Sequence, residues 1–315
     1  MAESLLERKN YGDKAYKLAL TGTAVLIPIL LGFLVYELWS GASLAMARYG
    51  FGFVTSSTWD PVAEEFGAFP LIFGTLLSSL IALLIAVPLS LGVAIYLTEF
   101  APKAVRQPVA FLIGLLAAIP SVVYGLWGIF VLIPVLRTTA FPLLRDALGF
   151  LSLFKGPIYG PSMLAAGIIL AIMVMPYVMS VAREVLLAVP NTQREAALAL
   201  GATRWEAVTT AVVPYARSGL IGAVILGLGR ALGETMAVTM VIGNRHEIAA
   251  SLFAPGYTMA AAIANEFSEA VGDLHLSALA YVAFVLFLVT VAVNAGARLL
   301  IWRVARGSGA GSSAL

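Results

Sequence analysis

The sequence predicts an all-α membrane protein that crosses the bilayer with six transmembrane helices. Of its 315 residues, 61% are hydrophobic and 11% are charged, whereas soluble domains average about 45–50% and about 25%. Mean hydropathy is +0.96. No stretch shows the alternation of a β-barrel strand, which leaves helices as the way to satisfy the backbone in lipid. Six stretches approach or exceed the ~20 apolar residues of a membrane-spanning helix: 18–39, 71–97, 109–136, 163–182, 220–243 and 276–302.

The same composition excludes several classes of protein. So large an apolar excess cannot be hidden in one water-soluble core, and a disordered chain lacks such an excess. The sequence has no cysteine, which excludes disulfides and thiolate chemistry, and its two histidines argue against a multi-histidine metal centre. A net charge of +2 gives no basis for nucleic-acid binding. We therefore predict no catalytic residue, no metal and no nucleic-acid partner.

The remaining segments frame a membrane domain at 18–302 with a core at about 71–302. The polar residues 1–17 precede a first span of 22 residues, which is long for a signal peptide and is interpreted as an uncleaved helix. The segment 41–69 is long enough for a small cap or a short helix. The tail 303–315 is predicted to be disordered because it is rich in Gly and Ser. Prolines are expected to kink the apolar stretches at 28, 88, 120, 134 and 176.

Loop charges predict the orientation. With the N-terminus inside, thirteen of the nineteen Lys and Arg residues fall in inner segments, five fall in outer segments and Arg230 falls within a span. Positive residues accumulate on the cytoplasmic side of membrane proteins. Both termini are therefore predicted to be cytoplasmic, although the outer segment 137–161 is itself mildly basic.

The longest inner loop, 183–215, joins the fourth and fifth spans. Asn191 or Thr192 could cap a helix there, and Gly201 could end it in left-handed geometry. An Ala/Leu run of good helix formers lies between them. The pattern predicts a short exposed helix, then a turn, then a second helix that breaks before Pro214. Docking into the groove of a partner and simple linkage of two spans explain such a helix equally well.

This loop resembles the EAA loop of ABC-importer permeases. Glu195, Ala196 and Ala197 are followed after three residues by Gly201 and after nine more by a segment ending in Pro214. The family pattern has Ile and Leu where this chain has the smaller Ala211 and Val213. The resemblance implies a type I (MetI-like) permease fold. It also implies that the helix carrying Glu195, Ala196, Ala197 and Gly201 couples the chain to a separate ATPase subunit.

The chain shows no ATP site of its own. A P-loop needs a lysine followed by Ser or Thr, and the five lysines are followed by Asn, Ala, Leu, Ala and Gly. Energy must therefore come from another polypeptide or from an ion gradient. The resemblance to ABC-importer permeases implies the first source: a transport subunit that binds no cofactor, with ATP hydrolysed by a partner.

Two charges lie inside the predicted fifth span. Arg230 follows Arg217 by 13 residues, which is roughly 20 Å along a helix and places it near the middle of the bilayer. Glu234 would lie on the same face of a continuous helix, where the two charges could neutralise each other. Buried charges at that depth are costly, and we favour a water-filled substrate path. Nearby glycines indicate that the helix packs closely against another helix.

Residues 229–238, GRALGETMAV, resemble the matching helix of phosphate-specific ABC permeases, and residues 53–75 resemble their PstC-type subunit. The resemblance extends from about 53 to 302. It implies a substrate path for phosphate at Arg230 and Glu234 in the bacterial inner membrane. It also implies four kinds of partner: a PstA-type permease, two PstB-type ATPase subunits, a periplasmic PstS-type phosphate-binding protein and the lipid bilayer.

Other functions are weaker interpretations. Permeases for sulfate, molybdate or phosphonate share the EAA loop, so the loop cannot distinguish them from a phosphate permease. A secondary transporter would use Arg230 and Glu234 as a proton-coupled pair, but clear inverted repeats are not evident. A membrane-embedded enzyme would need further acids or histidines within the spans, where Glu234 is the only central acid.

Overall fold

The computed structural model describes residues 11–309 and shows a mostly helical chain with six helices suited to cross a membrane. This confirms the predicted fold class. Four spans are formed by α1 (Tyr11–Tyr49), α3 (Phe69–Ile95) with the π-helical turn η2 (Tyr96–Phe100), α8 (Met163–Leu187) and α14 (Asp273–Gly309). The other two spans, Ser121–Thr138 and Arg204–Leu232, are each assembled from several shorter helices.

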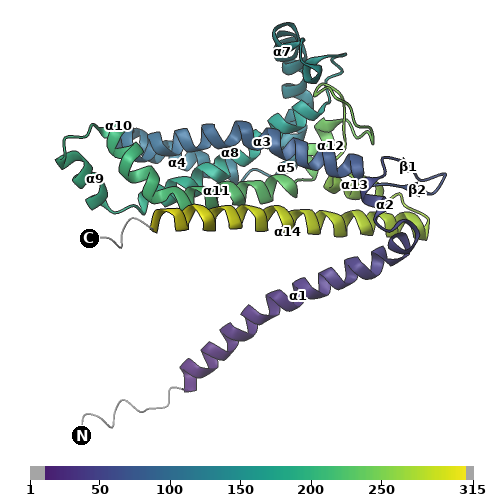
Figure 1. The fold of residues 1–315 in the computed structure, drawn as a ribbon, viewed down its shortest axis with the longest axis horizontal. Coiled ribbons are helices and arrows are strands. Elements are labelled where there is room, and N and C mark those ends of the chain that lie inside the picture. Colours follow the sequence, from purple (N-terminus) through teal and green to yellow (C-terminus); the bar gives the residue numbers. More distant parts are fainter. Residues whose placement is uncertain (1–10, 310–315) are drawn as a thin grey trace.

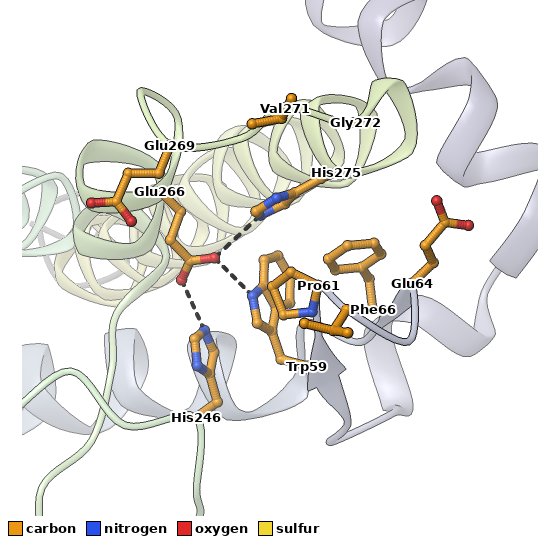
Figure 2. A pocket seen from close by; sticks show the side chains of 11 residues that line it. Trp59, Pro61, Glu64, Phe66, His246, Glu266, Glu269, Val271, Gly272 and His275 are labelled. Atoms are coloured by element: carbon orange, nitrogen blue, oxygen red, sulfur yellow. Dashed lines mark hydrogen bonds and ion pairs between the residues drawn. The ribbon is translucent and has the colours of Figure 1, made fainter.

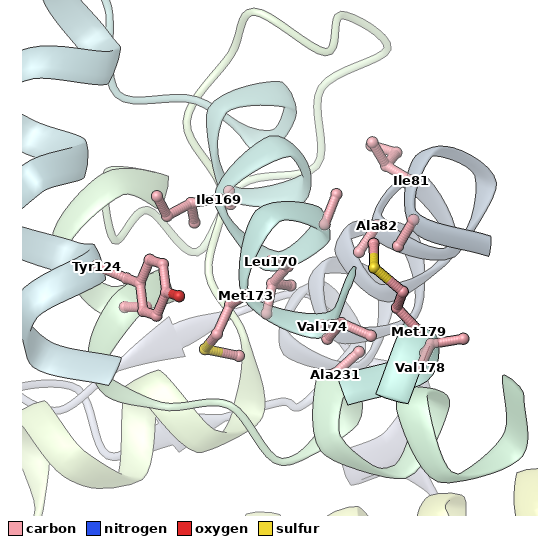
Figure 3. Close-up of a cluster of buried hydrophobic side chains, with 14 of the residues drawn as sticks. Ile81, Ala82, Tyr124, Ile169, Leu170, Met173, Val174, Val178, Met179 and Ala231 are labelled. Atoms are coloured by element: carbon pink, nitrogen blue, oxygen red, sulfur yellow. The ribbon is translucent and has the colours of Figure 1, made fainter. Parts of the chain in front are cut away.

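The core lies around α8, which packs against α3, α11 and α5 (Figure 3). Small residues allow this closeness. A side chain at Gly167 of α8 would collide with Ile81 of α3, and Ala82 and Ala166 are fully buried beside them. Because dispersion contacts rather than hydrophobic exclusion hold helices together in lipid, such close approach stabilises the pair.

The first helix stands apart from this body and meets it near one end (Figure 1). The side chains of its most apolar stretch are not buried by any other part of the described chain. Contact with α14 includes the Trp39 ring, whose centre lies 5.4 Å from that of Phe284, and Gly41, where a side chain would crowd the Cβ of Ala280. Ser277 Oγ donates to the Gly41 carbonyl at 2.7 Å and accepts from the Ala45 amide at 3.0 Å. The rest of α1 presents an apolar surface that needs lipid or another protein around it.

The prediction of one continuous third span at 109–136 is wrong. The chain forms α4 (Lys103–Ala117), breaks at 118–120, and then continues as α5 (Ser121–Trp127), the π-helical turn η3 (Gly128–Leu132) and α6 (Ile133–Thr138). Pro120 explains the break, since proline disfavours helical geometry at the preceding residue and offers no amide donor. The sequence predicted only a kink there.

The fifth span also differs from its predicted bounds, 220–243. It runs through α10 (Arg204–Ala207), the π-helical turn η5 (Val208–Val212) and α11 (Val213–Leu232), and then stops. A separate helix α12 (Met236–Ile242) follows the break and ends at Gly243, whose φ is +96°. The expected break before Pro214 is absent, because the π-helical turn η5 runs directly into α11. Local π-helical adjustment of this kind accommodates a proline within a membrane helix.

In the inner loop, α9 (Asn191–Ala199) is the predicted short helix, and Gly201 follows it with φ +87° as expected. The predicted Asn191 or Thr192 cap is wrong, since the N-cap is Pro190 and its side chain accepts no hydrogen bond. Instead Thr203 caps α10 in a capping box with Glu206.

Short elements close the opposite end. They are α2 (Gly52–Thr55), a hairpin of β1 (Trp59–Asp60) and β2 (Glu65–Phe66), and α13 (Met259–Glu266). The hairpin pairs Trp59 with Phe66. Between α6 and α8 lie α7 (Ala140–Leu148) and the 3₁₀ turn η4 (Ser152–Phe154). Of the predicted tail 303–315, residues up to 309 are helical, contrary to the prediction, and the remainder lies outside the described residues, as do residues 1–10 of the N-terminal segment.

The structure allows a test of the predicted orientation, because the loop segments predicted to lie on opposite sides of the membrane lie at opposite ends of the molecule. The start of α1, the end of α14 and α9 lie toward one end of the molecule, and the hairpin and α13 lie at the other (Figure 1). Cysteines introduced at the exposed Thr58 and Ser268 should react with an impermeant thiol reagent in intact cells, and one at the exposed Thr203 should react only after permeabilisation. Labelling of Thr203→Cys from outside would contradict the predicted orientation.

Candidate coupling, path and outer sites

The predicted coupling surface is the exposed helix α9 and the turn after it. Glu195 and Ala196 are exposed, Ala197 is half-buried, and Leu200 is 91% exposed. An added Cβ at Gly201 would meet no atom within 4 Å. The structure therefore brings the four predicted coupling residues onto one short projection at the end of the helical body. An exposed leucine beside an exposed helix is suited to a groove on another protein.

The two predicted path residues are not a helical pair. Arg230 lies in the last turn of α11, and Glu234 lies in the break before α12. Glu234 Oε1 accepts a hydrogen bond from the Ala237 amide at 3.2 Å and so caps α12. Among the described residues, neither side chain forms an ion pair. The expectation that they share a face of one continuous helix is wrong, because the helix ends between them.

An aromatic ring accompanies Arg230 instead. Its guanidinium carbon lies 5.7 Å from the ring centre of Tyr177 on α8, within the range of a cation–π contact. Its Nε atom is buried and has no hydrogen-bond partner within residues 11–309. The ring steadies the cation without cancelling its charge, which leaves donors for an anion. Sequence reasoning missed Tyr177, since no spacing links it to Arg230.

The predicted role of the glycines in packing holds at two positions. Side chains at Gly219 and Gly227 would collide with Val185 and Val178 of α8. Gly229 is different: a Cβ there would meet nothing within 4 Å. It lines a hollow of about 530 Å³ between α11 and α14, whose wall includes Leu226, Thr290, Asn294 and Arg298.

A third site, missed by the sequence analysis, is centred on Glu266 (Figure 2). It lies at the end of the molecule opposite α9, which is called the outer end here after the predicted orientation, and the end with α9 is called the inner end (Figure 1). Glu266 Oε2 accepts from Trp59 Nε1 at 2.8 Å and lies 3.3 Å from His275 Nε2. Glu266 Oε1 lies 3.2 Å from His246 Nε2. The His246 ring stacks on Trp59 with centres 5.2 Å apart. One carboxylate thus joins the hairpin, the loop after α12, α13 and the start of α14.

These side chains border a hollow of about 490 Å³. Burial raises the pKa of Glu266, but the contacts with His246, Trp59 and His275 together outweigh burial and lower this pKa below its usual value. Burial also raises the pKa of the nearby Tyr257 to about 12. Because Nε2 of His246 and Nε2 of His275 both face its carboxylate, Glu266 holds the outer elements together.

The outer elements are fixed to α3 by contacts at Thr75 and Gly74. The Met259 amide donates to Thr75 Oγ1 at 2.9 Å, and Thr75 donates in turn to the Leu71 carbonyl at 2.8 Å. Gly74 leaves room for the Tyr257 carbonyl, which a side chain would strike. These contacts give α13 and the Glu266 site a defined place on the core.

Comparison with known proteins identifies the class. Residues 86–306 match the model of the binding-protein-dependent transport system inner membrane component family. The fold is similar to that in an inward-facing form of the MetNI methionine ABC transporter, with TM-score 0.51, 17% identity and coverage of 76% of this chain and 94% of that one. It is also similar to a bacterial ABC transporter involved in alginate import, with TM-score 0.52, 19% identity and coverage of 90% and 97%.

Relatives with higher sequence identity indicate which kind of permease this chain resembles within that family. The phosphate transport system permease protein PstC of Mesorhizobium japonicum is 46% identical over 95% of this chain and 92% of that protein. Those of Xylella fastidiosa and Haemophilus influenzae are 48% and 46% identical, over 94% and 91% of this chain and 93% and 92% of those proteins. The chain therefore belongs to the binding-protein-dependent inner-membrane permease family and, within it, to the PstC family.

The Glu266 site predicts an acid-sensitive outer end. A carboxylate whose folded pKa lies below its unfolded value stabilises the fold above the unfolded pKa, near 4.5, and this stability is lost as pH falls through the folded pKa. Amides of the hairpin and α13 should therefore exchange faster with deuterium at pH 4 than at pH 6.5, after correction for intrinsic rates. Amides of α8 should not change. The Glu266→Gln variant should lose this pH dependence, and its persistence there would contradict the assignment.

Proposed function

We propose that this chain is the permease subunit of an ATP-driven phosphate importer in the bacterial inner membrane. In this proposal it forms part of the phosphate path and couples to a separate ATPase subunit. The observation that carries the proposal is the exposed projection of Glu195, Ala196, Ala197 and Gly201 on a permease fold. The PstC names of relatives at 46–48% identity support phosphate over sulfate, molybdate or phosphonate.

The proposed complex has four kinds of protein. This chain pairs with a PstA-type permease, and two PstB-type ATPase subunits bind the inner loops, including α9. A periplasmic PstS-type protein delivers phosphate to the outer end, with both termini of this chain on the cytoplasmic side. The chain itself hydrolyses no ATP and binds no cofactor in this proposal. The uncovered apolar surfaces of α1 and of the hollow between α11 and α14 support contact with lipid and with the second permease.

The chemistry of the path follows from the break after α11. Phosphate is an anion with several acceptor oxygens, and a guanidinium binds such a group with parallel hydrogen bonds. Among the described residues, no carboxylate pairs with Arg230, since Glu234 accepts the Ala237 amide and Tyr177 offers only a ring face. Arg230 would lower the barrier for the anion while the weak, exchangeable contact allows release. Closure of the ATPase subunits would draw the inner loops together and tilt the spans, giving alternating access.

The coupling role predicts the behaviour of Gly201→Asp. Asp is among the few residues other than glycine that adopt the left-handed backbone, so the subunit should insert normally. Its charge should weaken docking, which should reduce ATPase co-purification or substrate-stimulated ATP hydrolysis. Gly201→Asn is the matched control because it has the same shape and backbone tolerance without the charge. Equal, wild-type coupling in both variants would contradict docking at this turn.

The path role predicts a graded series at Arg230. Arg230→Gln should abolish phosphate uptake by assembled complexes, and Arg230→Lys should retain part of it because an ammonium lacks the guanidinium fork. Glu234→Gln should still assemble, since its amide oxygen can cap α12. The measurement is uptake of labelled phosphate per assembled complex. Wild-type uptake by Arg230→Gln would contradict the proposed path.

A further inference from the structure

One residue of α9 points into the protein rather than toward a partner. Arg194 Nε donates to Glu99 Oε2 at 3.0 Å, and its Nη2 donates to Glu99 Oε1 at 2.8 Å, which makes a two-pronged ion pair. The same guanidinium donates to the Leu186 carbonyl at 3.0 Å and to the Val189 carbonyl at 2.7 Å. The side chains of Arg194 and Glu99 are only 20% and 10% exposed.

These contacts join three parts of the chain. Glu99 lies in η2, the end of the second span, and Leu186 lies in the last turn of α8, the fourth span. Val189 lies in the turn that leads to α9. Carbonyls at the end of a helix lack partners within it and favour a positive charge. Arg194 meets that need while binding Glu99, so a single guanidinium ties α9 to α3 and α8.

Other contacts of α9 are weak by comparison. The helix contains no buried residue, which means that little apolar packing fixes it. A hollow of about 170 Å³ lies against it, lined by Glu99, Arg194, Leu198 and Arg204 among others. A helix with few packed side chains and a hollow behind it can move unless polar contacts hold it.

The turn that carries Glu99 is held from a second side. Arg106 of α4 donates from Nη2 to the Thr98 carbonyl at 2.7 Å. Thr98 Oγ1 donates back to the Ala94 carbonyl of α3 at 2.9 Å. The turn η2 is thereby linked to α3 and to α4, and a force on Glu99 reaches both helices.

We propose that the Arg194–Glu99 pair is the link through which movement of α9 reaches the spans α3 and α8. Both are positioning residues for coupling, and neither touches phosphate or ATP. The two-pronged geometry fixes direction as well as distance, which suits the pair to transmit a displacement. This inference rests on the proposed function, because it presumes that a partner ATPase moves α9.

The test uses the complete complex in proteoliposomes and compares Glu99→Ala, Arg194→Ala and the double variant. Each variant should retain its ATPase subunit and hydrolyse ATP. The amount of phosphate imported per ATP should fall by about three- to thirty-fold, which corresponds to the changes in coupling energy that mutations along such networks produce. The double variant should be no worse than either single one, because both remove the same link. Wild-type phosphate import per ATP in Glu99→Ala would overturn the proposal.

The chain offers a matched control at the same end of α8. Arg183 Nη1 lies 2.7 Å from Glu184 Oε1, but this ion pair joins neighbours on one helix and transmits nothing between helices. Arg183→Ala should keep the wild-type ratio. If Glu99→Ala fails to assemble, Glu99→Gln, which keeps the size and one acceptor oxygen, should assemble with an intermediate ratio. Loss of the ATPase subunit from both Glu99 variants would assign the pair a merely structural role and overturn the proposal.

A separate readout distinguishes failure of the link from failure of the proposed function. Spin labels at the exposed Gln193 and Tyr96 report the distance between α9 and η2. In the wild-type complex this distance should stay constant on ATP binding because the two move together, whereas in Glu99→Ala it should change. If the wild-type complex imports no phosphate, the proposed function fails, and the distance still tests the link. Equal distance behaviour in both proteins would overturn the link.

Discussion

The structure depends on one constraint: within a bilayer, backbone groups must find partners inside the protein. A spanning helix therefore breaks only where replacement partners are available. The chain breaks after α11 at 233–235, and there Glu234 supplies a hydrogen-bond acceptor for the Ala237 amide at 3.2 Å. That duty separates Glu234 from Arg230 and leaves the arginine beside the Tyr177 ring. The position of an unneutralised cation thus follows from the way the helix ends.

At each end of the molecule, a carboxylate joins separate segments. Glu99 at the inner end binds Arg194 of α9, and Glu266 at the outer end contacts Trp59, His246 and His275. Between them, α3 runs the length of the core beside α8, with Glu99 just beyond its inner end and the Thr75–Met259 contact near its outer end. A displacement at α9 can therefore reach the outer elements through one packed pair of helices.

The length of the apolar stretches predicted the number of spans but not the bounds of the third and fifth. Helix signals and motif spacing predicted α9 and its left-handed Gly201. Composition could not locate the breaks near Pro120 and Gly233, because prolines and glycines also occur in unbroken membrane helices. The Glu99–Arg194 and Trp59–Glu266 contacts join residues 95 and 207 positions apart. No local pattern encodes such pairs, since they arise only when the helices pack.

Reconstitution with a PstA-type permease, the ATPase subunits and the binding protein tests the central claim most directly. Proteoliposomes with ATP on the side of α9 should accumulate labelled phosphate in proportion to ATP hydrolysed. Excess sulfate or molybdate should not reduce this uptake, and collapse of the proton gradient should leave it unchanged. Uptake that follows an imposed proton gradient without ATP hydrolysis would contradict the account, because it would make the chain an ion-coupled transporter.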